Sequence, residues 1–207
     1  MKLAVVTAGL TQPSSTRLLA DRLTEAVTRR LGHADVRVIE LRELAVDVAN
    51  AFVTGFPNTR LRAAMESVER ADGLIAVTPI FSGSYSGLFK SFFDVLDNSA
   101  LAGKPTLIAA TGGTARHSLA LEHALRPLLT YLRAVVVPTA VYAASEDWGG
   151  RRDDFTEALS ERVDRAAAEL SALLLRRPAA AERQEPAGGE PEVVPFEEQL
   201  AALRPAD

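Results

Sequence analysis

The chain is organised around the stretch Thr78-Pro79-Ile80-Phe81-Ser82-Gly83-Ser84-Tyr85-Ser86-Gly87. An apolar run, residues 74–77, precedes it, and Pro79 removes a ladder donor, so we expect a buried strand to end there. After the stretch, apolar side chains recur at the spacing of one helix face, at Leu88, Phe89, Phe92, Phe93 and Leu96. The pattern predicts a strand, a loop and an amphipathic helix in succession.

The loop within this stretch combines small residues with aromatic rings. Gly83 and Gly87 allow backbone amides to approach a ligand that a Cβ would keep away. Phe81 and Tyr85 offer stacking surfaces beside those amides. The combination suits a flat heteroaromatic ring with polar edges. The alternative is an ordinary strand-to-helix turn that binds nothing.

Length and composition are those of an ordinary globular protein. The 207 residues are enough for one well-buried α/β domain and too few for two. Hydrophobic residues make up 47% of the chain and charged residues 24%, and the formal net charge is −4. With so mild a charge and no basic block, nucleic acid is not an expected partner.

Residue types that the chain lacks exclude several kinds of site. There is no cysteine, which excludes disulfides, thiolate catalysis and cysteine metal sites and is compatible with a reducing cytosol. The three histidines are scattered and lack the spacing of metal ligands. The apolar run at the start is too short for a signal peptide or a membrane span. We therefore expect a soluble, cytoplasmic protein with no metal site and no membrane association.

Apolar runs and helical patterns alternate along the chain. Strands are predicted at residues 3–7, 36–41, 74–77, 105–111 and 135–142, and helices at 15–31, 61–68, 88–96, 119–133 and 154–175. Residues 42–58, which include Gly55 and Pro57, are expected to be irregular. This alternation predicts an α/β fold, a doubly wound five-stranded parallel sheet in the order 2-1-3-4-5.

Two strands carry signs of an outer position, and the chain's end carries signs of disorder. Arg37 and Glu40 interrupt the second strand, and Pro138 is tolerable in the fifth only near an edge. Residues 1–176 are expected to form one domain. Residues 177–207 read as a linker and tail, largely disordered because Ala, Glu, Pro and Gly dominate the linker, and only residues 193–203 show an amphipathic pattern.

Two further loops follow predicted strands. Residues 8–17 are rich in hydroxyls and lead into a helix for which Ser15 or Thr16 is the expected N-cap and Gly32 the stop. Free amides and the helix dipole would favour an anion there, although plain N-capping is an equal alternative. Neither a dinucleotide-binding glycine fingerprint nor a Walker motif is present. The other loop, residues 111–118, has two adjacent glycines. In the predicted order, all three loops leave the carboxyl ends of the strands beside one crevice.

Several motifs resemble one known family. They are Ala71-Asp72-Gly73-Leu74-Ile75, the stretch from Thr78 to Gly87 with Lys90 after it, Ala110-Thr111-Gly112-Gly113-Thr114, and Leu121-Glu122-His123-Ala124-Leu125-Arg126-Pro127. With these motifs residues 1–175 resemble the NADPH-dependent FMN reductases of the flavodoxin-like superfamily. The resemblance is closest to the flavin reductases that serve two-component monooxygenases.

The resemblance implies FMN and NADPH, or NADH, and assigns the site residues. Ser14, Ser15, Thr16 and Arg17 would hold the FMN phosphate. The flavin ring would be lined by Pro79, Ile80, Phe81, Ser82 and Tyr85, and its pyrimidine edge would meet Thr111, Gly112 and Gly113. The first loop departs from the family, because Gly9-Leu10-Thr11-Gln12 stands where relatives commonly have Gly-Ser-Pro-Arg. Arg17 is the residue expected to replace the missing arginine.

The implied reaction needs no catalytic side chain, since hydride passes directly from nicotinamide to flavin N5. The implied function is an NAD(P)H:FMN oxidoreductase, a homodimer or homotetramer, that supplies reduced FMN to a partner flavin-dependent monooxygenase. The alternatives are a quinone or azo reductase with retained FMN and a flavodoxin-type electron carrier. Nothing in the residues separates NADPH from NADH, although Arg116 and His117 are candidates for a ribose-phosphate contact.

One proline lies inside a predicted helix. Pro127 has no N–H for the carbonyl of His123, four residues earlier, and its ring crowds that carbonyl. A kink or a π-bulge is therefore predicted at His123. The resemblance implies an aromatic residue at this point, in a bulge at a subunit interface, where this chain has histidine. The alternative is a harmless kink with His123 in solvent.

Overall fold

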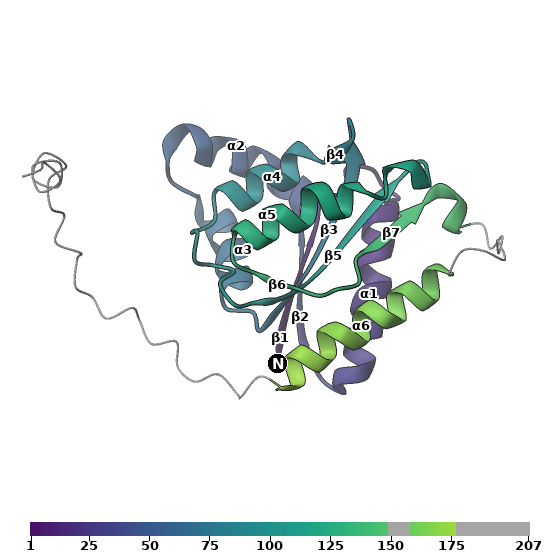
Figure 1. Cartoon of the computed structure of the whole chain (residues 1–207). Coiled ribbons are helices and arrows are strands. Elements are labelled where there is room, and N and C mark those ends of the chain that lie inside the picture. Colours follow the sequence, from purple (N-terminus) through teal and green to yellow (C-terminus); the bar gives the residue numbers. More distant parts are fainter. Residues whose placement is uncertain (149–157, 177–207) are drawn as a thin grey trace, which may run out of the picture. The chain divides into compact units, whose positions relative to one another are not determined.

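A parallel sheet forms the centre of the domain. The computed structural model describes residues 1–148 and 158–176. Its strands are paired in the order β2-β1-β3-β5-β6, all of them parallel (Figure 1), with bounds β1 Lys2–Thr7, β2 Asp35–Glu40, β3 Gly73–Phe81, β5 Pro105–Gly112 and β6 Val135–Val136. This confirms the predicted α/β class, the parallel sheet and the outer position of β2.

The prediction of five strands is wrong, because the sheet has seven. The expected fifth strand is broken into β6 and β7 (Val141–Ala144), which both pair with β5. Pro138 lies in the break, where its own carbonyl and that of Val137 accept hydrogen bonds from Arg126 instead of from a strand. The other additional strand, β4 (Ser84–Tyr85), folds back antiparallel on the end of β3.

Helices cover both faces of the sheet. On one face α1 (Ser15–Leu31) and α6 (Leu159–Arg176) pack over a core that includes Val5, Ile75 and Leu107. The other face is covered by α2 (Ala45–Thr54), α3 (Thr59–Glu69), α4 (Gly87–Asp94) and α5 (Arg126–Tyr131). Figure 1 shows this doubly wound arrangement. Continuous apolar strands buried on both faces are what such a sheet requires.

The helix ends show which capping predictions hold. The N-cap of α1 is Ser14, one residue before the expected Ser15, and its Oγ accepts from the Arg17 amide at 3.2 Å. Gly32 ends the helix as predicted, with φ at +74°. The last helix is described only from Leu159, and the expected start at residue 154 lies outside the described residues, as do the predicted linker and tail.

Residues 42–58 are not irregular as expected. A 3-10 turn at Leu41–Leu44 leads directly into α2, which buries Val48 and Ala51 and ends at Gly55 in the left-handed conformation. The helical spacing of the buried residues is hard to recognise in the sequence, because Val46, Phe52 and Val53 are also apolar although they are exposed. The helix is therefore apolar on both sides, which no one-sided pattern describes.

The helix around His123 contains the predicted distortion. Residues Leu121–Leu125 form a π-helical turn, and α5 continues from it. Pro127 lies at the start of α5, directly after this π-turn, where its missing N–H removes one bond of the continuous helix. No helix in the described part of the chain is long and apolar enough to cross a bilayer.

The amino ends of β3 and β5 are joined by a buried cation. Lys104, only 2% exposed, directs its Nζ at three backbone carbonyls, those of Val68 at 2.6 Å, Glu69 at 2.9 Å and Ala71 at 2.8 Å. These carbonyls lie at and just beyond the end of α3, where helical partners run out and positive charge is favoured. Lys104 thus supplies a donor to three carbonyls at a helix end, two of them in buried contacts.

Candidate functional site

Three loops leave the carboxyl ends of neighbouring strands. The first loop, residues 8–14, follows β1, the second loop, residues 82–86, follows β3, and the third loop, residues 113–120, follows β5. Their bases are directly bonded, since the Ala8 amide donates to the Val77 carbonyl at 3.0 Å and Pro79 lies opposite Thr111 in the ladder. The predicted convergence of three loops at one edge is confirmed.

The first loop prepares the start of α1. A Cβ on Gly9 would lie 2.1 Å from Ser14 Oγ, so glycine at this position makes room for the capping side chain. Ser15 and Thr16 are the first two residues of the helix, and their amides have no intrahelical acceptor by position. An anion placed there would receive both amides and the positive end of the helix dipole.

Arg17 lies in the first turn of α1 between two carboxylates. Its Nε donates to Asp21 at 2.8 Å and its Nη1 to Glu40 on β2. The hydrogen bond to Asp21 is the largest of the effects that raise the pKa of the guanidinium. The side chain is 35% exposed. Arg17 therefore links α1 to β2, and only its remaining N–H groups are left for an anion.

The second loop is a tight hairpin with an exposed aromatic ring. Ser82 and Gly83 both have positive φ, +49° and +81°, which is the geometry of a two-residue turn that matches strand twist. The turn places Ile80 opposite Tyr85 in the β3–β4 pair. Phe81 remains 46% exposed although it is a large apolar side chain. Its ring is thus available for stacking.

Buried hydroxyls fix the second loop from below. Thr78 Oγ1 accepts from the Ser86 amide at 3.1 Å and donates to the Pro79 carbonyl at 3.0 Å. Ser86 in turn caps α4 by accepting from the Phe89 amide at 3.2 Å. The loop is therefore held in one conformation without any ligand, which favours pre-organised binding.

The third loop is joined to α1 and to β7. Thr111 Oγ1 lies 2.8 Å from Thr16 Oγ1, and both residues are buried. The Tyr142 hydroxyl donates to the Thr114 carbonyl at 2.9 Å, and burial raises the pKa of that hydroxyl. A Cβ on Gly113 would meet open space.

The expected site residues thus divide into two groups. Thr16 and Thr111 meet through their hydroxyls, Pro79 lies beside Thr111, and Ile80 pairs with Tyr85. Ser82 and Arg17 have structural roles instead, because Ser82 forms the hairpin turn and Arg17 pairs with two carboxylates. Sequence reasoning missed Thr78 and Tyr142, whose hydroxyls support the loops. Thr78 stands only as the first residue of the organising stretch and Tyr142 only as part of the expected fifth strand, and no local pattern marks the hydrogen bonds that their side chains make.

The arrangement fits an FMN molecule. A Cβ added to Gly83, Gly87 or Gly113 would meet nothing within 4 Å, so a ligand can approach the backbone closely at these positions of the second and third loops. The amides at the start of α1 suit a phosphate, and the exposed Phe81 suits a flat ring. In the described ranges no group of three His, Asp or Glu side chains is placed to hold a metal ion.

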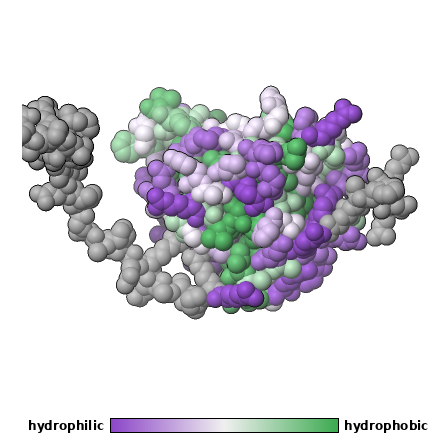
Figure 2. Space-filling view, in the orientation of Figure 1, coloured by the Kyte–Doolittle hydropathy of each residue, from purple (hydrophilic) through white to green (hydrophobic). Residues whose placement is uncertain are grey.

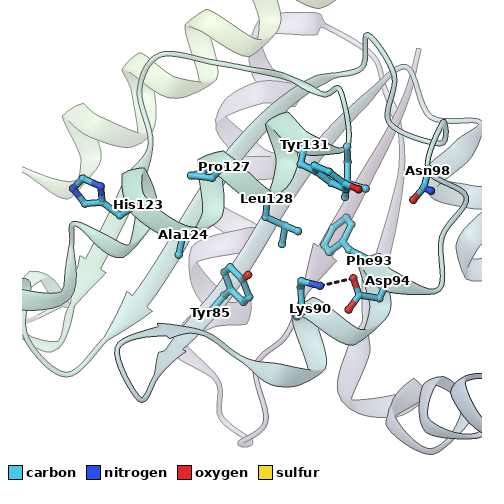
Figure 3. Close-up of a pocket in the computed structure, with 11 residues that line it drawn as sticks. Tyr85, Lys90, Phe93, Asp94, Asn98, His123, Ala124, Pro127, Leu128 and Tyr131 are labelled. Atoms are coloured by element: carbon cyan, nitrogen blue, oxygen red, sulfur yellow. Dashed lines mark hydrogen bonds and ion pairs between the residues drawn. The ribbon is translucent and has the colours of Figure 1, made fainter. Parts of the chain in front are cut away.

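A separate pocket of about 440 Å³ lies between α4 and the π-turn with α5 (Figure 3). It shares Tyr85 with the second loop, and Figure 3 shows the Lys90–Asp94 ion pair along one wall and His123 at one end. Its other lining residues are Phe93, Asn98, Ala124, Pro127, Leu128, Tyr131 and Leu132. Tyr131 is 79% exposed at the rim.

Trp148, which the sequence leaves without a role, packs against the α1–α6 side of the core. The Arg22 guanidinium carbon lies 4.9 Å from the centre of its ring. This is the geometry of a cation–π contact at the protein surface. Trp148 therefore holds the end of β7 against α1.

Comparison of the sequence with known proteins identifies a family of enzymes. The family model described as NADPH-dependent FMN reductase matches residues 1–149. An FMN reductase (NADPH) of Pseudomonas aeruginosa is 39% identical over 176 residues, which is 84% of this chain and 91% of that protein. An NADH-dependent FMN reductase SfnF of Pseudomonas putida is 33% identical over 172 residues, 83% of this chain and 92% of that protein.

Solved structures agree with the sequence comparison. An oxidoreductase from Corynebacterium diphtheriae superposes with a TM-score of 0.81 at 49% identity, over 86% of this chain and 98% of that one. The apo form of the NADH:FMN oxidoreductase EMOB superposes with a TM-score of 0.75 at 30% identity, over 86% of this chain and 91% of that one.

Proposed function

The chain belongs to the NADPH-dependent FMN reductase family, and we propose that this oxidoreductase supplies reduced FMN to a partner flavin-dependent monooxygenase. It uses FMN with NADPH or NADH, as the family match and the two kinds of relative indicate. The observation that carries the proposal is the edge of the sheet where the three loops meet, at which Phe81 is 46% exposed and a Cβ added to Gly113 would meet nothing within 4 Å. A flavin bound at an exposed edge can dissociate, which its delivery to a second enzyme requires.

We assign the FMN contacts to the three loops. The phosphate would meet the Ser15 and Thr16 amides at the start of α1, with Ser14 and the remaining N–H groups of Arg17 beside it. A ring stacked on Phe81 would also lie along the strand end and hairpin formed by Pro79, Ile80, Ser82 and Tyr85. Thr111, Gly112 and Gly113 would meet its pyrimidine edge.

FMN held by these loops would supply the hydride-accepting chemistry of the reaction with a nicotinamide nucleotide. The chain's residues need only position the two rings and favour the charge that follows reduction. Backbone amides of Gly112 and Gly113 are suited to the second task, because fixed dipoles stabilise charge without reorganising. The hydroxyls of Thr78 and Thr111 hold the strand ends rigid beneath the rings.

We also propose that the protein is a cytoplasmic homo-oligomer. The outward face of α2 and the turn after it expose Val46 at 71%, Val53 at 87% and Phe56 at 76%. Figure 2 shows this hydrophobic cluster at the end of the molecule where α2 lies. Contiguous apolar surface of this kind commonly marks a contact between subunits. A second copy of the chain, presenting the same face, would cover it.

Steady-state kinetics test the proposed function. NADPH and NADH oxidation should be measured with FMN, FAD and riboflavin, and reduced flavin transfer with a flavin-dependent monooxygenase in the same cuvette. We expect saturable turnover with free FMN and product formation by the monooxygenase. FMN that copurifies in stoichiometric amount and does not exchange would favour the retained-flavin quinone reductase. FMN binding without nucleotide oxidation would favour the electron carrier.

A further inference from the structure

We propose that Tyr142 is a positioning residue for flavin binding, because its hydroxyl sets the path of Gly112, Gly113 and Thr114. The inference rests on the proposed contact between these glycines and the flavin pyrimidine edge. Tyr142 lies on β7, 4% exposed, and is placed opposite Ala110 in the β5–β7 ladder. Its hydroxyl reaches past the end of that ladder to the third loop.

The hydrogen bond fixes one end of the glycine pair. Tyr142 donates to the Thr114 carbonyl at 2.9 Å, and Thr114 is the residue whose Oγ1 caps the short 3-10 turn after it. The other end is fixed by the buried contact between Thr111 Oγ1 and Thr16 Oγ1. Gly112 and Gly113 therefore lie between two side-chain anchors, which determine where their amides point.

The same hydroxyl explains why residue 112 is glycine. A Cβ there would lie 2.1 Å from the Tyr142 hydroxyl oxygen and 3.1 Å from its Cζ. The positive-φ glycines of the described chain do not include Gly112, so space and not backbone conformation excludes a side chain. Gly113, by contrast, has nothing within 4 Å of an added Cβ. The hydroxyl end of the Tyr142 ring thus occupies the space that a side chain at residue 112 would need.

This geometry separates the role of Tyr142 from that of the first loop. Tyr142 supports the amides that would face the ring, whereas Ser14 and Arg17 lie where the phosphate would be. Loss of the hydroxyl should therefore weaken the binding of FMN and of riboflavin equally, because both molecules carry the same ring. A residue that acts through the phosphate would weaken FMN alone.

The test is Tyr142→Phe, with Tyr131→Phe as the matched control, since Tyr131 is 79% exposed and outside the three loops. Dissociation constants for FMN and riboflavin are measured by flavin fluorescence, together with kcat, KM and melting temperature. We expect Tyr142→Phe to raise the dissociation constants of FMN and riboflavin about tenfold, which corresponds to the loss of one hydrogen bond. The KM for flavin should rise to match, with kcat at saturation nearly unchanged. Tyr131→Phe should match wild type.

A double-mutant cycle with Gly112→Ala checks the contact itself. In the wild-type background the added methyl group must displace the hydroxyl, so flavin binding should weaken at least as much as in Tyr142→Phe. In the Tyr142→Phe background the 2.1 Å contact is removed and only the 3.1 Å contact with Cζ remains, so the same methyl group should weaken flavin binding less than it does in the wild-type background. Additive effects of the two changes would overturn the inference.

The outcomes distinguish this inference from the proposed function. If wild-type protein binds and reduces FMN but Tyr142→Phe binds both flavins within twofold of it, the inference alone is overturned. Weakening of FMN without riboflavin also overturns it. If the wild-type protein does not bind FMN, the proposed function fails and the inference fails with it.

Discussion

The two ends of the sheet treat their backbone polar groups in opposite ways. At the amino end, Lys104 is buried and satisfies three carbonyls after α3. At the carboxyl end, the Ser15 and Thr16 amides have no helical acceptor, Ser82 has a positive φ and Phe81 is exposed. One end is closed by the chain's own side chains, and at the other the first amides of α1 have no intrahelical acceptor and an aromatic ring is exposed.

This difference shows where stability and binding reside. Interactions at the closed end contribute to folding, because unpaired buried carbonyls are costly. The open end instead presents helix amides without intrahelical acceptors and an exposed aromatic ring, groups that can bind a ligand. Variants at the two ends should therefore affect different measurements, and the predictions below begin with the largest effect.

Lys104→Met should cause the largest loss of stability. Three carbonyls, two of them in buried contacts, lose the Nζ donor while the aliphatic part of the side chain is kept, which should lower the free energy of unfolding by about 2–4 kcal/mol. Urea unfolding measures this loss, and FMN affinity of the folded fraction should stay at the wild-type value. Lys90→Met, which breaks an exposed pair with Asp94, is the control and should cost under about 0.5 kcal/mol. Similar losses of unfolding free energy in Lys104→Met and Lys90→Met would show that the amino end of the sheet has no special role in stability.

Arg17→Ala should affect binding more than stability. If a remaining guanidinium N–H meets the phosphate, the KM for FMN should rise about tenfold, the value of a charged hydrogen bond. The KM for riboflavin should not change. Asp21→Asn, which weakens the competing ion pair but leaves Arg17 in place, is the control. Equal changes for FMN and riboflavin in Arg17→Ala would assign Arg17 to the link between α1 and β2 alone.

Glu122→Gln probes a contact that belongs to neither end. Arg126 holds Glu122 at 2.6 and 2.9 Å, and this hydrogen bonding lowers the pKa of the carboxyl. A lowered pKa stabilises the fold above the ordinary Glu value and ceases to do so as pH falls through the folded value. At pH 7 we expect a loss of at most about 0.5 kcal/mol, because the carboxyl is half exposed. The difference from wild type should vanish in acid, and a difference that persists there would point to packing instead.

Truncation after Arg177 should have the smallest effect. The core of the described chain is closed by α6, which ends at Arg176 with Leu170 and Leu174 buried. Melting temperature and reductase turnover of the shortened protein should equal those of the full chain. A drop of several degrees, or lost turnover, would place residues 177–207 within the functional fold.

The sequence alone predicted those features that a single residue determines through its own backbone. Pro127 predicted a kink or a π-bulge at His123, of which the structure has the second, and Gly32 predicted the end of α1. The alternation of apolar runs with helical patterns predicted the class of fold and the convergence of three loops. Each of these signals is local, so it survives without knowledge of what packs against it.

The sequence was insufficient where a residue's partner is distant. The partners of Lys104 lie 33 to 36 residues earlier, and the carbonyl that Tyr142 bonds lies 28 residues earlier. Nothing near either residue announces these contacts. The broken fifth strand has the same origin, because Arg126 and Glu169 capture the backbone of residues 137–139. The helical period of α2 was hidden by apolar residues that face outward.

The orientation of α5 depends on the number of residues in the π-turn at Leu121–Leu125. It holds one residue more than an α-helical turn would, and each residue of an α-helix advances about 100° around the axis. Deletion of a single residue from this turn would let an α-helix form and rotate α5 by that angle. Leu129, now fully buried, would be carried away from the core. A one-codon deletion should thus be more harmful at this point than almost any substitution.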